Sequence, residues 1–336
     1  MPTGTSMIAT AIDMHSHYYG GLVDDLLQRG ARPNVSRNAD GRLVLNAMTA
    51  STVMTDGYTD VAVRLAYMDT HGIATQLLTF PGALGVDVMP VAEVGGAIAA
   101  YNDHLADIIH ASHGRFVGLG GLPLADTAKA AAEMGRLRHD LKLSGAILPG
   151  NYFLSRDAAK ALTPVLEAAN AARALLMIHP GLMPGESPPD PYADTSVYRA
   201  SVLNLQASLS QMAMTVLSGG LAEAYPNITF QLVNLGGTLP FILERLEAVA
   251  LSRPPHDAFP RHSLRGMVYD CASLGPRALE LAVHVFGADR IMLGTDYPIF
   301  VPHQVRDTVM AANLSDEDKA HILHGTARGV LDRISA

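Results

Sequence analysis

Two histidines separated by one residue stand near the N-terminus, in the segment Asp13-Met14-His15-Ser16-His17. They follow an apolar run over residues 7–12, which predicts a buried strand. Because side chains alternate faces along a strand, His15 and His17 point to the same side, about 7 Å apart along the chain. Two imidazoles at the end of a buried strand can bind one metal ion; the alternative is a pair of unrelated surface histidines.

Two further polar residues stand at or just beyond the ends of apolar runs later in the chain. His179 ends the run of residues 174–179, and Asp296 lies two residues beyond the run of residues 290–294. Both runs have the length and composition of buried strands. His179 by itself also fits a core histidine, and Asp296 by itself fits a helix cap. Their significance therefore depends on where the fold places them.

The chain alternates apolar strands with helical segments. We predict eight buried strands, near residues 7–12, 74–80, 116–121, 144–148, 174–179, 228–233, 266–270 and 290–294. Helices are expected near residues 24–30, 59–71, 90–113, 126–140, 157–172, 196–217, from 240, from 276, 303–312 and 316–334. This alternation predicts an α/β fold, a distorted (β/α)8 TIM barrel closed by C-terminal helices. Residues 34–46 predict a small inserted hairpin, and we expect one domain over residues 1–336 with insertions at about 20–58 and 181–195.

A barrel of this kind would bring the four polar residues together, because the active site of a TIM barrel lies at the carboxyl ends of its strands. Strand one supplies His15 and His17, strand five supplies His179, and strand eight supplies Asp296. Three imidazoles and one carboxylate suit one divalent metal ion and leave a position for water or substrate. Zn²⁺ is the metal that we expect, and Mn²⁺ or Co²⁺ suit the same ligands.

Composition limits the partners and the location. The 336 residues carry a net charge of -8, with 49% hydrophobic and 17% charged residues, which supports a large core and argues against nucleic acid as a partner. We expect no membrane span and no signal peptide, because no apolar run has the required length or flanks. Cys271 is the single cysteine, so a reducing cytoplasm is the expected location. The expected partner is a small-molecule substrate.

Four motifs resemble those of a known enzyme family. Residues 13–17, 178–180, 233–241 and 293–298 are similar to motifs of the amidohydrolase superfamily, in the branch typified by aminocarboxymuconate-semialdehyde decarboxylase. The resemblance extends over about residues 8–334. It implies a distorted barrel that binds one metal ion through four matching residues: His15, His17, His179 and Asp296. It also implies a homodimer, because family members are commonly dimers.

The sequence differs from the family at functional positions. Asn234 stands where many decarboxylases of the branch have a histidine that activates the metal-bound water or moves a proton. Asparagine forms hydrogen bonds but cannot shuttle a proton near neutral pH. Asp296 is therefore the expected proton-transfer residue, and Asn234 is expected to hold the substrate or a water. Strand four ends in Ile147-Leu148-Pro149 where binuclear relatives have a carboxylated lysine or a glutamate, which agrees with a single metal. Thr326 replaces the usual asparagine after Gly325, with only a packing consequence expected.

Other polar and aromatic residues near the predicted strand ends complete the expected pocket. The expected substrate contacts are Tyr18, Phe80, Asn151, Asn234 and His303, with Tyr19 a further candidate wall residue. His303 is also a second candidate for proton transfer, with a solvated helix start as its alternative. Asp270 is expected to orient a ligand histidine. Three arginines are candidates to bind a substrate carboxylate: Arg64, Arg199 and Arg265.

Three functions fit these residues. The resemblance implies a carboxy-lyase, a metal-dependent non-oxidative decarboxylase of an aromatic or conjugated carboxylic acid. The alternative is a metal-dependent hydrolase of an amide, ester or lactone, which uses a metal-bound water with Asp296 as the base. The third is a binding protein that has kept the barrel and lost activity, and the intact set of metal-binding residues argues against it. The motifs do not identify the substrate.

Overall fold

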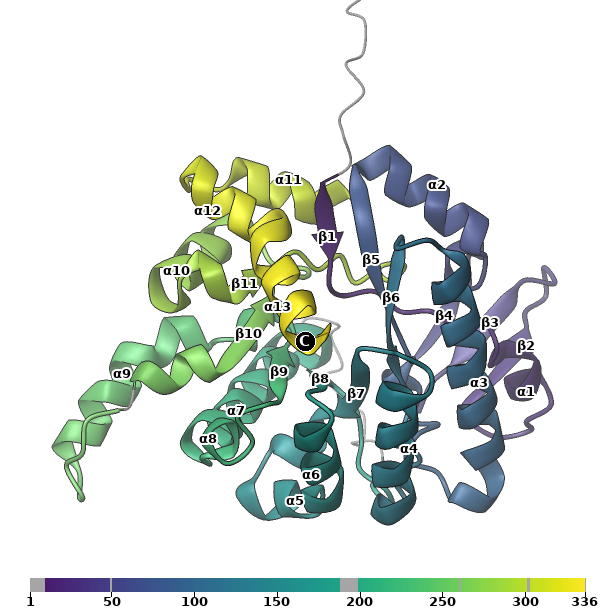
Figure 1. The fold of residues 1–336 in the computed structure, drawn as a ribbon, viewed down its shortest axis with the longest axis horizontal. Coiled ribbons are helices and arrows are strands. Elements are labelled where there is room, and N and C mark those ends of the chain that lie inside the picture. The colour runs from purple at the N-terminus through teal and green to yellow at the C-terminus, as the bar shows by residue number, and fades with distance from the viewer. Residues whose placement is uncertain (1–9, 49, 188–198, 260, 301–302, 336) are drawn as a thin grey trace, which may run out of the picture.

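A ring of eight parallel strands forms the centre of the computed structural model, which describes residues 10–48, 50–187, 199–259, 261–300 and 303–335. In chain order the strands are β1 (Ala11–Asp13), β5 (Ile73–Thr79), β6 (Phe116–Gly120), β7 (Gly145–Pro149), β8 (Leu175–His179), β9 (Thr229–Leu232), β10 (Met267–Asp270) and β11 (Ile291–Met292). Each strand pairs in parallel with the next in this order (Figure 1). The predicted TIM barrel is confirmed.

The ring closes between β1 and β11 through the residues that follow these two strands. The backbone N–H of Met14 donates to the carbonyl of Leu293 at 2.8 Å, and that of Asp296 donates to the carbonyl of His15 at 2.7 Å. The first and last strands of the barrel lie far apart in sequence, and these bonds join them. The backbone therefore brings His15 next to Asp296.

The barrel strands are nearly continuous apolar runs because helices cover their outer face and side chains fill the interior. All five residues of β7 and all four of β9 and β10 are buried. A few buried polar side chains interrupt these runs, and they belong to the hydrogen bonds that support the site described below. Among them are Asp13, Gln76, Thr79, Gln231 and Asp270.

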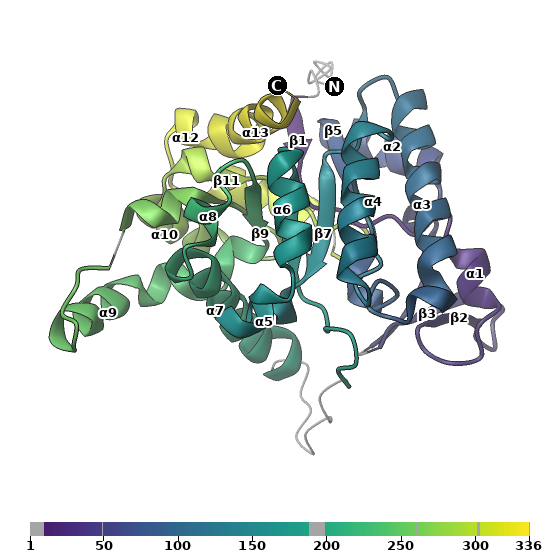
Figure 2. The same cartoon turned by 60° about the horizontal axis from the view of Figure 1, so that its bottom comes forward.

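Helices form the outer layer around the strands (Figure 2). They are α2 (Val61–His71), α3 (Val91–Ala111), α4 (Thr127–His139), α5 (Arg156–Lys160), α6 (Thr163–Ala171), α7 (Leu205–Ser218), α8 (Leu221–Ala224), α9 (Leu239–Ser252), α10 (Pro276–Phe286), α11 (His303–Ala311), α12 (Asp316–Ala320) and α13 (Thr326–Ser335). Local sequence explains several starts: the side chains of Asp60 and Asp126 cap α2 and α4, and Pro276 opens α10.

Three predicted helices are interrupted. The helix predicted over residues 157–172 is α5 and α6, because Pro164 in the first turn of α6 cannot donate the backbone hydrogen bond of a continuous helix. The helix predicted over residues 316–334 is α12 and α13, joined by the π-helical segment η8 (His321–Gly325). The helix predicted over residues 196–217 begins, in the described part, with the π-helical segment η4 (Arg199–Asn204) and continues as α7; residues 196–198 lie outside the described residues.

The first insertion is a three-stranded antiparallel sheet rather than the predicted hairpin. Strands β2 (Asn34–Arg37) and β3 (Leu43–Asn46) pair as expected, and β4 (Ser51–Val53) adds to β3. This sheet lies beside the short helix α1 (Val23–Leu27), on one side of the barrel (Figure 1). Of the second insertion, residues 181–187 form a loop, and residues 188–195 lie outside the described part of the chain.

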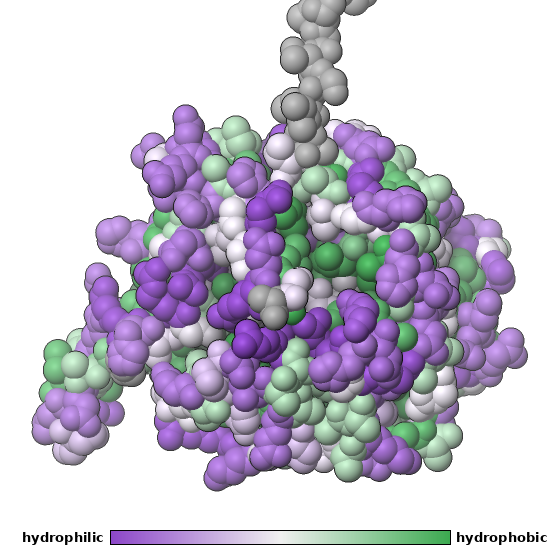
Figure 3. All heavy atoms as spheres, in the orientation of Figure 1, coloured by the Kyte–Doolittle hydropathy of each residue, from purple (hydrophilic) through white to green (hydrophobic). Residues whose placement is uncertain are grey.

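Helix α9 projects away from the rest of the molecule in both ribbon views (Figures 1 and 2). Phe241 is 80% exposed and Leu251 is 57% exposed, so this helix presents large apolar side chains to solvent. The space-filling view shows apolar surface at its projecting end (Figure 3). Among the described helices, none combines the length and the apolar character that crossing a membrane requires.

Candidate metal centre

The barrel brings His15, His17, His179 and Asp296 into one cluster. His15 and His17 follow β1, His179 is the last residue of β8, and Asp296 follows β11. Each residue offers one possible ligand atom, and these four atoms all lie within 4.8 Å of one another. The three imidazole rings stand nearly perpendicular to one another, with centroids 4.8 to 5.4 Å apart.

Each histidine uses Nδ1 for a contact outside the cluster. Nδ1 of His15 lies 3.1 Å from Oδ2 of Asp270. Nδ1 of His17 lies 2.8 Å from the hydroxyl of Thr79, and Nδ1 of His179 lies 3.1 Å from the carbonyl of Pro180. These contacts fix the ring orientations and leave Nε2 of each ring for a ligand.

The donors of this cluster fit one divalent metal ion. Nε2 of His15 and Oδ1 of Asp296 are buried, and neither has a hydrogen-bond partner among the described residues. Oδ1 of Asp296 lies 3.1 Å from Nε2 of His17 and 3.6 Å from Nε2 of His15, so these atoms face one point. A cation bound there would satisfy the buried atoms, and three nitrogens with one oxygen are donors that Zn²⁺ and its neighbours accept.

The charges within the cluster also suit a cation. Burial raises the pKa of Asp296, but His15 and His17 outweigh it and hold this pKa below its usual value. Burial lowers the pKa of His17, and burial together with the two neighbouring histidines lowers that of His179 well below its usual value. Burial opposes protonation of His15 too, but Asp270 and Asp296 raise its pKa to about 9. Metal binding requires the neutral imidazole and would oppose that protonation.

The expected contact between Asp270 and a histidine of the cluster is confirmed, because Asp270 contacts His15. Asp270 also accepts several further hydrogen bonds. Its Oδ2 accepts from Nε2 of Gln231 at 3.1 Å, and its Oδ1 accepts from the backbone N–H of Asn234 at 3.2 Å and of Ala272 at 3.1 Å. Asp270 is fully buried. These bonds hold the carboxylate that in turn holds His15.

Asp13 is a supporting residue that the sequence analysis missed. Its carboxylate accepts from the backbone N–H of His15 at 3.2 Å and from the Thr295 hydroxyl at 2.6 Å. It also accepts from Nε2 of Gln76 at 2.9 Å, so it links β1, β5 and the segment that carries Asp296. The signal was present in the sequence, because Asp13 stands two residues before His15 and shares its face of the strand.

Asn234 lies beside the cluster in a strained backbone conformation. It begins the 3₁₀ segment η5 (Asn234–Gly236), and its φ is +53°. Its Oδ1 is buried and has no hydrogen-bond partner among the described residues. A non-glycine residue held in the left-handed region with an unsatisfied amide oxygen is a feature of functional sites.

Two of the expected pocket residues point away from the cluster. The hydroxyl of Tyr18 lies 3.2 Å from Nε2 of His104 on α3, and the ring of Phe80 packs on Tyr101 of the same helix with centroids 5.1 Å apart. Alternation along the chain explains both, since His17 and Thr79 point inward and the next residue points outward. Both side chains therefore contact α3 and not the cluster, and their contact with a substrate stays a prediction.

Tyr19 follows His17 by two residues, so alternation directs it to the same side as His17. Its ring packs on that of Tyr58, with centroids 4.9 Å apart. Burial raises the pKa of both tyrosines, and the negative charge of Asp296 raises each further. Tyr58 belongs to the short segment η1 (Asp56–Tyr58) in the first insertion, and no motif or periodicity in the sequence indicated it.

The remaining predicted substrate contacts lie partly in the loops that follow the barrel strands and partly elsewhere. Asn151, in η3 (Gly150–Phe153), donates from Nδ2 to Glu186 at 2.7 Å and so contacts the loop that follows β8. His303 begins α11, and its side chain lies outside the described residues. Arg199 begins η4 and is exposed. Arg265 donates to Asp289 at 2.5 Å near the amino ends of the strands, far from the expected carboxylate.

Arg64 is fully buried and serves the fold rather than a substrate. Its guanidinium donates to the Ser16 hydroxyl at 3.1 Å, to Oε1 of Gln76 at 2.8 Å and to the carbonyls of His17 and Gly57. The prediction that Arg64 binds a substrate carboxylate is therefore wrong. The bonds to Ser16 and His17 hold the segment that carries two of the cluster residues.

Comparisons with known proteins agree with this site and fold. An amidohydrolase family model matches residues 12–333. The chain is 26% identical over 279 residues to the 2-amino-3-carboxymuconate-6-semialdehyde decarboxylase of Dictyostelium discoideum, which covers 80% of this chain and 75% of that protein.

Solved structures share the fold. One is the 5-carboxyvanillate decarboxylase of Sphingomonas paucimobilis, with a TM-score of 0.76 and 22% identity over 96% of this chain and 99% of that one. Another is the dihydroxybenzoic acid decarboxylase of Polaromonas sp. with bound manganese and the inhibitor 2-nitroresorcinol, with a TM-score of 0.73 and 20% identity over 96% and 97%. Because the family model spans nearly the whole sequence, this chain belongs to the amidohydrolase family.

Proposed function

We propose that this chain is a metal-dependent, non-oxidative decarboxylase, a carboxy-lyase, that acts on an aromatic or conjugated carboxylic acid. The observation that carries the proposal is the buried cluster of three histidines and one aspartate in a chain of the amidohydrolase family. The three similar proteins described above all bear decarboxylase names. The hydrolase alternative is not favoured, because none of these names describes hydrolysis.

The proposed ligands of one divalent ion are His15, His17, His179 and Asp296. When bound, the ion supplies a Lewis acid that polarises a substrate oxygen and attracts the substrate carboxylate. Zn²⁺ is the metal that we propose, since these donors are common in zinc enzymes. The manganese in the Polaromonas protein makes Mn²⁺ the first alternative to test.

Asp296 is the proposed proton-transfer residue. In decarboxylation the bond between the ring carbon and the carboxylate breaks, its electron pair stays on the ring carbon, and a proton joins that carbon. A carboxylate beside the reacting carbon can take a proton from a substrate hydroxyl or a water and deliver it. Asp296 belongs to the cluster and faces both His15 and His17, which supports this role.

Asn234 is the proposed holder of the substrate or of a water. Its buried, unpartnered side-chain oxygen supports this role, and its backbone N–H donates to Asp270, the carboxylate that contacts His15. Tyr19 replaces Tyr18 in the proposed pocket wall. Asn151 and His303 remain proposed substrate contacts at the rim.

Metal content and CO₂ release test the proposal together. We expect about one equivalent of a divalent transition metal in the purified protein by inductively coupled plasma mass spectrometry, and its loss in His179→Ala. His139→Ala is the matched control, because His139 is exposed at the end of α4. A panel of hydroxybenzoates is then assayed for CO₂, with and without a chelator.

We expect Asp296→Asn to retain a folded barrel and to lose at least 10²-fold in kcat, the order of a lost proton-transfer group. CO₂ release by a metal-depleted sample, or full activity of an Asp296→Asn variant that still binds metal, would contradict the proposal. Release of an alcohol or amine from esters and amides without CO₂ would favour the hydrolase instead.

Three further features are also proposed. We infer a single barrel domain over residues 1–336 and a cytoplasmic location, the latter supported by one buried, unpaired cysteine, Cys271. We also propose a homodimer, which the exposed apolar side chains of α9 support.

A further inference from the structure

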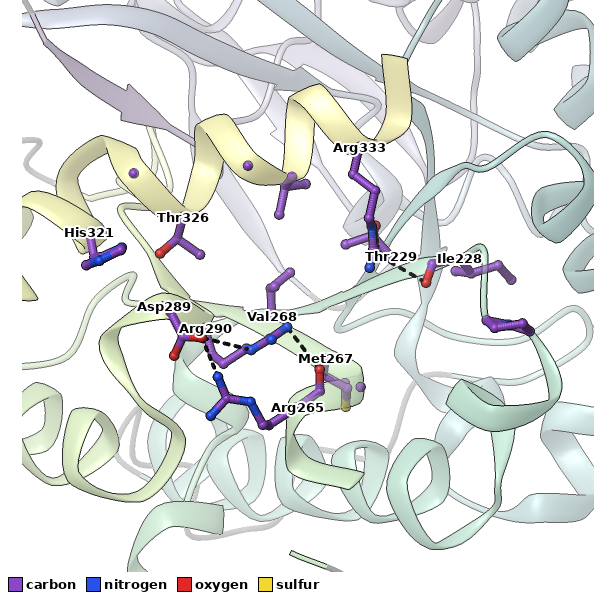
Figure 4. A pocket seen from close by; sticks show the side chains of 15 residues that line it. Ile228, Thr229, Arg265, Met267, Val268, Asp289, Arg290, His321, Thr326 and Arg333 are labelled. Atoms are coloured by element: carbon purple, nitrogen blue, oxygen red, sulfur yellow. Dashed lines mark hydrogen bonds and ion pairs between the residues drawn. The ribbon is translucent and has the colours of Figure 1, made fainter. Parts of the chain in front are cut away.

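A second cavity lies at the opposite end of the barrel from the four-residue cluster. Its volume is about 350 Å³. The first residues of β9 and β10, the segment before β11 and one side of α13 form its walls (Figure 4). The cluster follows the carboxyl ends of β1, β8 and β11, so the two sites are separate.

Positive charge dominates the lining of this cavity. It contains three arginines, Arg265, Arg290 and Arg333, and Asp289 is the one carboxylate among the described residues that line it. Asp289 accepts from Arg265 at 2.5 Å. Three guanidinium groups against one carboxylate leave two positive charges in excess.

Arg290 lies beside Arg265 and Asp289 in the wall of the cavity (Figure 4). Its Nη1 donates to the carbonyl of Arg265 at 3.0 Å. Its Nε is buried and lies 3.6 Å from Oδ2 of Asp289, and it has no hydrogen-bond partner among the described residues. Asp289 is therefore shared between two guanidinium groups, and the long ion pair balances the charge of Arg290 only in part.

Arg333 lines the same cavity as Arg290, from α13. Figure 4 shows its side chain reaching toward Thr229, whose hydroxyl accepts from Nη2, and the Ile228 carbonyl accepts from the same nitrogen at 3.4 Å. Burial and the charge of Arg290 lower the pKa of Arg333. The two cations therefore repel each other, and an anion between them would turn this repulsion into attraction.

Glycines on the C-terminal helical segment make room for a ligand. Gly325 and Gly329 both line the cavity, four residues apart, and Arg333 follows after four more. A Cβ atom built at Gly329 would meet no atom within 4 Å. The space beside Gly329, one helical turn before Arg333, is therefore open and not filled by packed side chains.

We propose that this cavity binds a small oxyanion, a phosphate or a carboxylate, between Arg290 and Arg333. A guanidinium group donates two parallel hydrogen bonds to either anion, with charge assistance. The excess of two positive charges, the shared carboxylate beside Arg290 and the open space at Gly329 all fit such a ligand. Phosphate and carboxylate share this chemistry, and the experiment separates them.

Isothermal titration calorimetry of the metal-loaded protein with inorganic phosphate and, separately, with succinate tests the proposal at ionic strength held constant with sodium chloride. We expect saturable binding of at least one anion. Arg333→Gln should weaken it about tenfold or more, because a charged hydrogen-bond partner is lost. Gly329→Leu keeps every charge and fills the cavity, so it should abolish binding.

Arg277→Gln is the matched control for the loss of one positive charge. Arg277 lies on α10, its side chain is 85% exposed, and it pairs with Glu280 outside the cavity. This variant should bind as the unmodified protein does. Thermal unfolding by circular dichroism verifies that each variant is folded, and if one cavity variant does not fold, the other decides.

Two results would overturn the proposal. One is the absence of saturable binding for both anions. The other is binding of unchanged affinity in the folded cavity variants, because the anion would then sit elsewhere, for example at the metal centre. Binding of phosphate alone or of succinate alone, with sensitivity to the cavity variants, supports the site and identifies its ligand class.

Discussion

At the scale of single residues, the cluster depends on carboxylates that do not belong to it. Asp270 holds Nδ1 of His15, and Asp13 holds the backbone N–H of His15 and the hydroxyl of Thr295. A hydrogen bond to Nδ1 fixes the tautomer and the orientation of a ligand histidine. Substitution of such a partner should weaken metal binding while the ligand residues stay in place.

For Asp270→Asn we expect metal affinity about 10- to 100-fold lower, because an amide cannot hold His15 as a carboxylate does. Competition with a chromophoric chelator measures this affinity. Asp157→Asn is the control, since Asp157 is an exposed acid that pairs with Lys160. An unchanged affinity in folded Asp270→Asn protein would show that Asp270 does not position the ligand.

Asp87 is a buried carboxyl whose effect should appear in the pH dependence of stability. It is 1% exposed, and burial, offset only in part by the backbone N–H groups of Asp87 and Val88, raises its pKa to about 8. The unfolded chain releases this proton near the ordinary pKa of an aspartate, about 4. Between these pH values the folded state binds more protons than the unfolded state, so Asp87 lowers the stability as the pH rises from about 4 to 8.

We therefore expect Asp87→Asn to increase the free energy of unfolding at pH 8, on the order of a few kcal/mol, and to change it little at pH 4. Urea denaturation at both pH values measures the difference. An equal effect at the two pH values would mean that ionisation of Asp87 does not contribute. Asp157→Asn again serves as the exposed control.

At the scale of elements, Arg64 joins helix α2 to the segment that follows β1. Its guanidinium bonds to Ser16, His17, Gln76 and Gly57, and it lies over the ring of Tyr297 at 4.8 Å. A planar group with several fixed donors can satisfy these acceptors at once, and a lysine ammonium cannot reproduce that geometry. The position of the ligand segment therefore depends on one side chain from a neighbouring helix.

Arg64→Lys should reduce the free energy of unfolding by about 3 kcal/mol, because buried acceptors lose their donors. Urea denaturation with the metal-loaded protein measures this loss. Arg277→Lys, on the exposed face of α10, should stay within about 0.5 kcal/mol. A similarly small change for Arg64→Lys would show that the network is replaceable.

At the scale of the whole molecule, the projecting helix α9 is the surface that best fits the proposed homodimer. It exposes two large apolar side chains, Phe241 at 80% and Leu251 at 57%, on an element that projects from the barrel. Interfaces of permanent homodimers are more apolar than the remaining surface, which such a helix would supply.

Size-exclusion chromatography with multi-angle light scattering should give twice the mass of one chain. Phe241→Asp should shift the protein toward the monomer, because a charge would be buried in the interface. Met310→Asp is the control, since Met310 is 54% exposed on α11. A monomeric unmodified protein would contradict the homodimer, and a dimeric Phe241→Asp protein would place the interface elsewhere.

The sequence by itself determined the barrel and the four residues that the structure gathers into the cluster. Periodicity is a local property, so eight apolar runs with intervening helices were visible, and the barrel topology then brings the ends of β1, β8 and β11 together. The sequence also contains Pro164, the residue that separates helices α5 and α6, although the periodicity of the flanking segments predicted one helix.

Only the tertiary structure decided what supports those four residues. The direction of Tyr18, the burial of Arg64 and the contacts of Asp13 depend on partners that lie far away in the sequence, such as His104 and Thr295. The lining of the cavity near Arg290 and Arg333 likewise comes from separate segments. Spacing along one chain defines a face of one strand or helix, but hydrogen bonds and charge pairs form between elements, and only their packing determines which atoms meet.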